Sequence, residues 1–158
     1  SLVNTVLNCL ALHHVPPEML ILEVTETTAM SNPDESVRVL TELTEAGVKA
    51  SIDDFGTGYS SLLYLKRLPA CELKIDRAFV KELSGESEDA TIVSAIVALA
   101  KTLNLKVVAE GVETEAQQAF LTELGCNTLQ GYLLGKPVSA QTIEALCARG
   151  EMLPGAGL

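Results

Sequence analysis

Short apolar runs alternate along the whole chain with amphipathic stretches, and this alternation constrains the fold more than any other feature of the sequence. It is typical of strand–helix units around a parallel sheet rather than of a sandwich or a helical bundle. Most of the runs are apolar on both faces, as expected for strands that are covered on both sides. We therefore expect an α/β fold with strands over residues 20–24, 48–53, 72–75, 106–109 and 128–133.

Helix signals stand between the predicted strands. Apolar residues recur at three- and four-residue steps over residues 92–103, so one face of a helix there would pack on the sheet. Thr114 and Gln117 have the spacing of a capping box before a helix that Gly125 would end. Further helices are expected over residues 2–14, 33–46 and 139–149, and residues 151–158 are expected to form a flexible C-terminal tail.

The chain length sets the size of this α/β fold. With 158 residues, 47% of them hydrophobic, we expect one domain with one core over residues 1–150. An eight-stranded α/β barrel typically needs about 250 residues. Because the five predicted strands amount to little more than half of such a barrel, we expect an incomplete TIM-type (β/α)8 barrel.

The charge balance limits the partners. Eleven Lys and Arg residues stand against 21 Asp and Glu residues, and the net charge of −10 opposes binding to nucleic acid polymers or anionic membranes. The apolar stretches are too short for a membrane segment, and the N-terminus lacks the basic region of a signal peptide. We expect a cytoplasmic protein whose cysteines are reduced and mostly buried, namely Cys9, Cys71, Cys126 and Cys147.

Each predicted strand is followed by polar residues that its folding does not require. The carboxyl ends of parallel strands converge, so we expect these side chains to meet. Clustered carboxylates repel one another unless a multivalent cation holds them ionised, and oxygen ligands without His or Cys indicate Mg²⁺ or Mn²⁺. Two such ions beside a lysine would suit phosphoryl chemistry. The residues concerned are Glu23, Glu26, Asp53, Asp54, Lys74, Asp76, Glu110, Glu113 and Gln130.

A purely structural explanation competes for each of these residues. A strand-end carboxylate often caps the next helix or pairs with a surface lysine. Glu113 could merely stabilise the N-terminus of a helix, and Gln130 could satisfy a buried backbone group. Asp76 could pair with the neighbouring Arg77. The repetition over five successive strands favours the functional interpretation.

The segment from Asp53 to Ser61 is the most specific feature of the sequence, since two adjacent acids are followed at once by Gly56 and Gly58. Its spacing fits neither of the glycine-rich phosphate loops, GxGxxG and the P-loop. A loop that directly follows paired metal ligands is better placed to couple metal binding to movement or to a partner surface.

Five motifs in a fixed order carry a resemblance to a known family. They are Glu23–Thr27, Asp53–Ser61, Leu73–Arg77, Val108–Thr114 and Gln130–Pro137. In sequence and order they resemble the motifs of the EAL-domain phosphodiesterases of bacterial cyclic diguanylate (c-di-GMP) signalling. The resemblance covers nearly all of residues 1–138.

The resemblance implies a role for each matching residue. Glu23, Asp53 and Asp54 would bind a pair of Mg²⁺ or Mn²⁺ ions. Lys74 would hold or polarise the attacking water. Glu110 would be a further metal ligand or the general base.

Other matching residues would support the site and its regulation. Gln130 would help to hold the site and the attacking water, and Asp76 and Glu113 would have supporting positions near it. Glu26 would anchor the loop after Asp54, which in the family couples dimerisation to activity. The resemblance thus implies a homodimer formed through this loop and the neighbouring helix, and sensory or cyclase domains upstream. The loop residues concerned are Phe55, Gly56, Thr57 and Gly58.

The chain also departs from the family pattern. The family's domain begins with a strand that carries the Glu-Ala-Leu signature and its metal-binding Glu, and a later strand supplies an Asn ligand. Neither is present in these 158 residues. The chain thus resembles strands four to eight with their helices, and we expect it to be inactive by itself.

For the intact protein the resemblance implies hydrolysis of one phosphodiester bond of c-di-GMP to linear pGpG. A catalytically silent c-di-GMP receptor and a pure interaction module are the alternatives. Retention of every ligand within reach favours the enzyme. A phosphodiesterase for another substrate also remains open, because nothing in the strand-end acids recognises a guanine.

Overall fold

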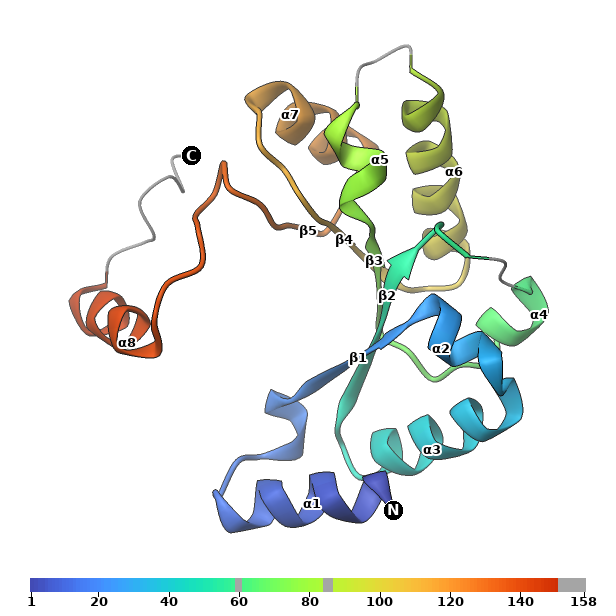
Figure 1. The fold of residues 1–158 in the computed structure, drawn as a ribbon, viewed down its shortest axis with the longest axis vertical. Coiled ribbons are helices and arrows are strands. Elements are labelled where there is room, and N and C mark those ends of the chain that lie inside the picture. Colours follow the sequence, from blue (N-terminus) through green and yellow to red (C-terminus); the bar gives the residue numbers. More distant parts are fainter. Residues whose placement is uncertain (59–60, 84–86, 151–158) are drawn as a thin grey trace.

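The computed structural model describes residues 1–58, 61–83 and 87–150. Within these residues a five-stranded parallel sheet has the order β1-β2-β3-β4-β5, so each strand lies beside its successor in the chain (Figure 1). Sequential parallel winding is that of a (β/α)8 barrel and differs from the reversed order of a doubly wound sheet. The predicted α/β class is confirmed. The strands are β1 (Ile21–Thr25), β2 (Lys49–Phe55), β3 (Glu72–Ile75), β4 (Lys106–Ala109) and β5 (Thr128–Leu129).

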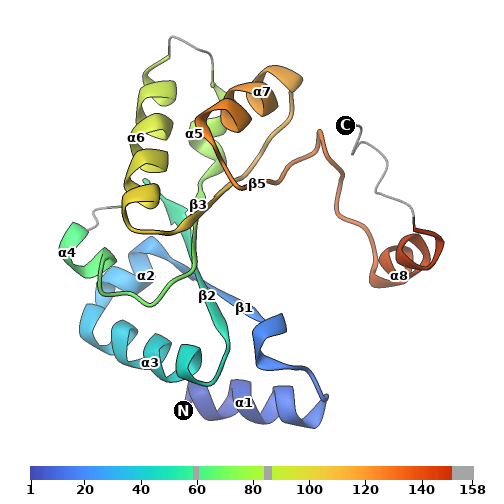
Figure 2. The same ribbon diagram turned by 180° about the vertical axis from the view of Figure 1, so that it is seen from behind.

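Helices connect the strands and cover the sheet. Figures 1 and 2 both show the last helix, α8, set apart from the other helices at the end of an extended segment. Among the helices of the described residues, none is both long and apolar enough to cross a membrane. The helices are α1 (Leu2–Leu12), η1 (Pro17–Met19), α2 (Glu26–Ser31), α3 (Pro33–Glu45), α4 (Leu62–Leu65), α5 (Arg77–Lys81), α6 (Glu88–Thr102), α7 (Glu115–Leu124) and α8 (Ala140–Arg149).

The main core lies between the sheet and its helices. Ile52, Leu73 and Val107 from three neighbouring strands are fully buried and belong to the same cluster as Val93 of α6. The predicted apolar stripe of α6 is confirmed except at its first member, Ile92, which is exposed. A smaller cluster joins α1 to α3.

Two predicted helix boundaries are confirmed in detail. Thr114 Oγ1 accepts a hydrogen bond from the Gln117 backbone, and the Gln117 side chain accepts one from the Thr114 backbone, so the capping box is complete. Gly125 ends α7 with a left-handed backbone (φ +87°). Asn32 precedes α3 and Gly47 follows its end. The short helices α2, α4 and α5 were not predicted, because four to six residues are too few to show a helical period.

The predicted strand over residues 128–133 is wrong beyond Leu129. The chain turns there instead, with Leu134 and Gly135 N–H groups donating to the Gly131 carbonyl. A Cβ at Gly131 would overlap the Val112 backbone, so only glycine permits this approach. The apolar alternation after Gln130 therefore resembles a strand in the sequence but forms a turn in the fold.

The four cysteines form no disulfide. The prediction that they are mostly buried is wrong for Cys9 and Cys147, which are exposed, whereas Cys71 and Cys126 are partly covered. The predicted tail, residues 151–158, lies outside the described residues, as do Tyr59 and Ser60 of the segment after Asp53.

Candidate catalytic and metal site

Four charged side chains from successive strands meet at the carboxyl edge of the sheet. The Lys74 ammonium lies 2.7 Å from Glu23 Oε1, 3.3 Å from Asp53 Oδ1 and 2.7 Å from Glu110 Oε1. The Lys74 side chain is only 7% exposed, whereas that of Glu23 is half-exposed. One buried ammonium thus contacts three carboxylates that are far apart in the sequence.

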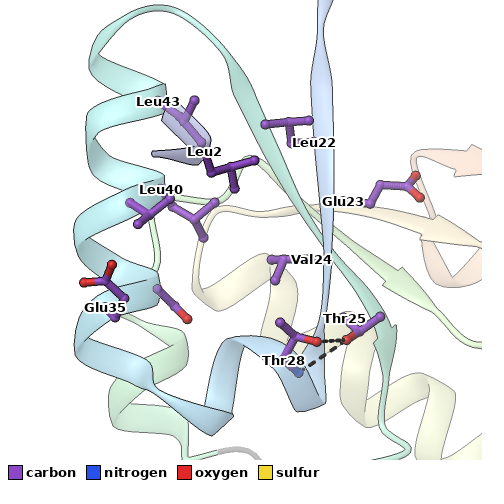
Figure 3. A pocket seen from close by; sticks show the side chains of 11 residues that line it. Leu2, Leu22, Glu23, Val24, Thr25, Thr28, Glu35, Leu40 and Leu43 are labelled. Carbon is purple, nitrogen blue, oxygen red and sulfur yellow. Dashed lines mark hydrogen bonds between the residues drawn. The ribbon is translucent and has the colours of Figure 1, made fainter. Parts of the chain in front are cut away.

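Strand geometry explains why these side chains share one face. Along β1, Leu22 and Val24 face the apolar space between the sheet and α3, while Glu23 points to the opposite side (Figure 3). That apolar space has a volume of about 510 Å³ and is lined on its other side by residues such as Leu40 and Leu43. Because successive side chains of a strand alternate between faces, partial burial of Leu22 and Val24 on one face directs Glu23 toward the polar face.

The same alternation holds in β3, where Lys74 stands between the fully buried Leu73 and Ile75. Burial by itself lowers the pKa of the Lys74 ammonium. Hydrogen bonds to Glu110 and Glu23 outweigh this effect, and the pKa of Lys74 lies above its ordinary value. The lysine is therefore a fixed positive charge among the acids.

Asp54 has an unusual backbone and an unusual carboxyl group. Its φ of +54° lies in the left-handed region, and its N–H donates to Asp53 Oδ1 at 2.9 Å. The pKa of Asp54 lies above its ordinary value. The largest cause is the loss of water around its carboxyl group, and the neighbouring charges of Asp53 and Asp76 and a hydrogen bond with Asp76 act in the same direction. A second acidic group, Asp53 with Asp54 and Asp76, therefore adjoins the Lys74 cluster.

The chemistry of these donors suits a hard divalent cation. They are carboxylate oxygens, and the acids Glu23, Asp53, Asp54 and Glu110 outnumber the single cation Lys74 among them. In the part of the chain that the structure describes, however, no three Asp, Glu, His or Cys side chains are already arranged to hold one metal ion. Glu23, Asp53 and Glu110 are instead paired with the Lys74 ammonium.

Glu26 holds the start of the loop after Asp54. Glu26 is 2% exposed, and its Oε2 accepts hydrogen bonds from the N–H groups of Gly56 at 2.9 Å and Gly58 at 3.2 Å. Phe55 is buried in the core, and Thr57 Oγ1 donates to the Asp54 carbonyl at 2.8 Å. The carboxylate of Glu26 thus fixes the backbone that follows the paired acids.

Gln130 lies beside Glu110 through backbone pairing. Its N–H donates to the Ala109 carbonyl at 2.9 Å, and its carbonyl accepts from the Val112 N–H at 3.0 Å. Glu110 and Gln130 line one hollow together with Glu113. These bonds belong to the backbone and do not test the alternative that the Gln130 side chain satisfies a buried backbone group; the residue itself is exposed.

Asp76 and Glu113 stand close to this edge with structural contacts of their own. Asp76 Oδ1 accepts from the Ala78 N–H at 2.8 Å and caps α5. Within the described residues it forms no ion pair with Arg77, so that alternative is wrong. Glu113 is exposed, and its N–H donates to Gln117 Oε1.

Two features near the site, the buried Ser51 hydroxyl and the contacts of Gln117 with α5, escaped the sequence analysis. Ser51, two positions before Asp53 on the same strand face, is fully buried, and its hydroxyl has no partner in the described structure. Gln117 is 6% exposed and connects the loop before α7 to α5. Nothing in the sequence pattern distinguished Ser51, a serine within an apolar strand. Gln117 was assigned to the capping box, which does not indicate its hydrogen bond to the Val80 carbonyl of α5.

The sequence and fold of this chain are similar to those of known proteins. A model of the EAL domain family matches residues 1–137. The chain is 65% identical over 148 residues to the bifunctional diguanylate cyclase/cyclic di-GMP phosphodiesterase MucR of Pseudomonas aeruginosa, with 94% of this chain and 22% of that protein covered. The chain spans about a fifth of the length of the curated relatives that it matches.

Solved structures share the fold. The PaMucR phosphodiesterase in complex with c-di-GMP superposes with a TM-score of 0.87 at 66% identity, over 90% of this chain and 57% of that one. BlrP1 of Klebsiella pneumoniae in a manganese and c-di-GMP complex gives a TM-score of 0.76 at 36% identity, over 85% and 34% of the two chains.

Proposed function

The chain belongs to the EAL domain family, and from this premise we propose that it is the catalytic part of a metal-dependent phosphodiesterase that acts on c-di-GMP. The convergence of Glu23, Asp53 and Glu110 on Lys74 carries the proposal. MucR is a cyclic di-GMP phosphodiesterase by name, and the PaMucR and BlrP1 structures are c-di-GMP complexes. The five-stranded sheet is part of a TIM-type barrel, and we extend the domain to residue 150.

We assign the carboxylates Glu23, Asp53, Asp54 and Glu110 to the binding of two Mg²⁺ or Mn²⁺ ions. Such ions would neutralise the attacked phosphate and lower the pKa of a bound water. The BlrP1 complexes contain calcium or manganese, which agrees with an oxygen-ligand site. In this assignment Asp76 is a supporting residue beside Asp54 and adds negative charge to the site.

Lys74 supplies a positive charge beside the reacting phosphate. Its ammonium is buried and held by three acids, so it is positioned to orient the attacking water and to stabilise negative charge on phosphate oxygens. Glu110 is placed either as a metal ligand or as the group that accepts the proton of the water. Gln130, in the same hollow, donates a hydrogen bond to that water. Water adds to one phosphorus, one P–O bond breaks, and linear pGpG leaves.

We place regulation in the loop that Glu26 holds. Because the Glu26 carboxylate binds Gly56 and Gly58, a change in this loop would reach Asp54 and Asp53 directly along the backbone. We propose that the loop and the neighbouring helix form a homodimer contact that couples assembly to activity in the cytoplasm. The length of the relatives is consistent with additional sensory or cyclase domains.

A c-di-GMP receptor without hydrolytic activity is the second candidate. One observation favours it: the carboxylates of Glu23, Asp53 and Glu110 are paired with the Lys74 ammonium. Such a receptor would bind c-di-GMP at the same edge and release no pGpG.

Hydrolysis by the intact protein separates the two candidates. The protein is incubated with c-di-GMP and Mn²⁺, and products are separated by chromatography. We expect pGpG from the wild type and none from Asp53→Asn or Glu110→Gln, while Glu123→Gln on the exposed face of α7 retains full activity. Binding without product in the wild type would establish the receptor instead, and neither binding nor product would refute both.

A further inference from the structure

The ion pair between Lys74 and Glu23 crosses a strand. Lys74 belongs to β3 and Glu23 to β1, and β2 lies between these strands in the sheet. The Lys74 ammonium is nevertheless 2.7 Å from Glu23 Oε1. Because neighbouring strands lie about 4.8 Å apart, the two side chains together bridge two strand spacings, which is about 10 Å. They must therefore pass over the residues of β2 that share their face.

The register of the strands identifies these residues of β2. Ser51 is the direct partner of Glu23 in the pairing of β1 with β2. In the pairing of β2 with β3, Ser51 lies opposite Glu72, two positions before Lys74. Paired residues of parallel strands point to the same face, and so do residues two positions apart in one strand. Ser51 and Asp53 therefore lie next to each other beneath the ion pair.

The burial of Ser51 agrees with this path. Ala50 and Ile52, on either side of it in β2, belong to the core between the sheet and its helices. Ser51 therefore faces the other side of the sheet, toward which Glu23 also points (Figure 3). Ser51 is 0% exposed, and the Lys74 side chain is 7% exposed. A short side chain is covered so completely only by longer ones beside it, and the register places Lys74 and Glu23 among its neighbours.

Hydrogen bonding by the Ser51 hydroxyl does not explain why a serine occupies this position. In the described structure its oxygen has no hydrogen-bond partner. An ammonium has three N–H donors, and that of Lys74 contacts three carboxylates. These contacts can use every donor and leave none for Ser51. The feature of residue 51 that matters to Lys74 is therefore its small volume.

We propose that Ser51 is a positioning residue, whose small side chain leaves the space through which Lys74 reaches Glu23. Protein interiors are close-packed, so one or two added methyl groups must displace a neighbouring side chain. Lys74 is the side chain in the way, since it lies across β2, and its ammonium would move away from the acids. This inference rests on the proposed function, because displacement of Lys74 affects hydrolysis only if its ammonium orients the attacking water.

Substitutions of different size at Ser51 test the proposal in the intact protein. Hydrolysis of c-di-GMP is measured with Mn²⁺, and kcat is referred to the folded fraction obtained from urea denaturation. Ser51→Val should lower kcat about 100-fold with little change in KM, because a misplacement of about 1 Å has an effect of this size. Ser51→Ala should keep the wild-type kcat. Ser51→Thr, which adds a single methyl group, should give a smaller loss and replaces the valine variant if that protein does not fold.

The position of the ammonium can be measured without turnover. An amine reacts with acetic anhydride only in its uncharged form, so an ammonium held by three acids is protected. In EDTA, mass spectrometry of digested samples should show acetylation of Lys74 about tenfold or more slower than that of the exposed Lys66, both in the wild type and in Ser51→Ala. In Ser51→Val the rate at Lys74 should rise about tenfold or more.

Ala50→Val is the matched control. Ala50 precedes Ser51 in β2 and is 2% exposed, but it belongs to the core on the helix side of the sheet. The added methyl groups should destabilise the fold from that side, while kcat and the acetylation of Lys74 remain those of the wild type. Wild-type acetylation of Lys74 in Ser51→Val, or equally fast acetylation in Ala50→Val and Ser51→Val, would overturn the proposal.

The acetylation of Lys74 separates this inference from the proposed function. If the wild type hydrolyses no c-di-GMP but Ser51→Val, unlike Ala50→Val, releases Lys74, the positioning is supported and the catalytic proposal fails. If Lys74 is released while kcat is unchanged, Ser51 positions the lysine and the catalytic role of Lys74 fails. If Lys74 stays protected in Ser51→Val and the wild type releases pGpG, the positioning is overturned and the phosphodiesterase stands.

Discussion

The Lys74 ammonium lies 2.7 Å from Glu110 Oε1, although these residues come from the ends of two different strands. The same ammonium contacts Glu23 and Asp53, so one cation pairs with acids from three other segments. Because the acids outnumber it, the cluster retains negative charge in the folded protein. The cluster therefore links the stability of this edge to its capacity for a divalent ion.

Replacement of Lys74 by an uncharged residue tests two roles of its ammonium, one in the stability of the fold and one in catalysis. Lys74→Met should leave three acids without their shared partner and destabilise the fold by about 1–3 kcal/mol, less than for a fully buried pair because Glu23 is half-exposed. Catalysis of c-di-GMP hydrolysis should fall at least about 100-fold. Urea denaturation and turnover measure the two effects.

Lys66→Met, at an exposed lysine after α4, is the matched control and should change neither quantity. Added Mn²⁺ should raise the urea midpoint of the Lys74→Met protein, since the ion can replace the missing positive charge. Unchanged stability and turnover in Lys74→Met would show that the ammonium is not part of the site.

The hydrogen bonds of Glu26 predict a local loss of order. In Glu26→Gln the amide replaces one acceptor oxygen by a donor and removes the charge, so the bonds from Gly56 and Gly58 weaken. We expect a loss of about 1–3 kcal/mol of stability and faster hydrogen exchange at these two amides. Glu18→Gln, at an exposed glutamate, should have no effect on either amide. Unaltered exchange at Gly56 in Glu26→Gln would contradict the contact.

Ser51 presents the opposite case, because removal of its hydroxyl should stabilise the protein. Its hydroxyl is fully buried and has no hydrogen-bond partner in the described structure. Ser51→Ala removes this unsatisfied group at nearly constant volume and should stabilise the protein by about 1 kcal/mol, or about 2–4 °C in Tm. Ser94→Ala removes a hydroxyl that donates to the Ala90 carbonyl and should give no such gain. A lower Tm in Ser51→Ala would show that the hydroxyl has a partner in solution.

Sequence patterns predicted which strand ends form the site, because the positions of the strand ends depend on the fold alone. Parallel winding brings strand ends together, so residues as distant as Glu23 and Glu110 could be assigned to one edge from the apolar runs before them. The capping box of Thr114 and Gln117 was equally readable, since it is a local spacing rule.

What the sequence could not show depends on side-chain directions and close approaches. Nothing in the pattern indicates that Lys74 binds three acids, because this depends on the direction of each side chain. The turn at Gly131 resembled a strand, since the contact that prevents a strand there comes from Val112, distant in the chain.

The approach of Gly131 to Val112 predicts strong sensitivity to a single methyl group. In Gly131→Ala the new Cβ would overlap the Val112 backbone, so the pairing that carries Gln130 must open. We expect a loss of about 3 kcal/mol or more. Gly150→Ala is the control: it has a positive φ of +65° but nothing within 4 Å, and should cost about 1 kcal/mol. Similar losses in the two variants, measured by urea denaturation, would contradict the close contact.

The cysteines predict a pH-dependent order of chemical modification. Burial raises the pKa of the Cys126 thiol to about 11, so near pH 9 only about 1% of it is the reactive thiolate. Its alkylation by iodoacetamide should therefore be slow and should accelerate about tenfold per pH unit up to about pH 10, whereas the exposed Cys9 and Cys147 are modified first. Mass spectrometry of digested samples measures each site, and unfolding in urea provides the control in which the difference disappears. Equal rates for Cys126 and Cys147 in the folded protein at pH 8 would show that Cys126 is not shielded.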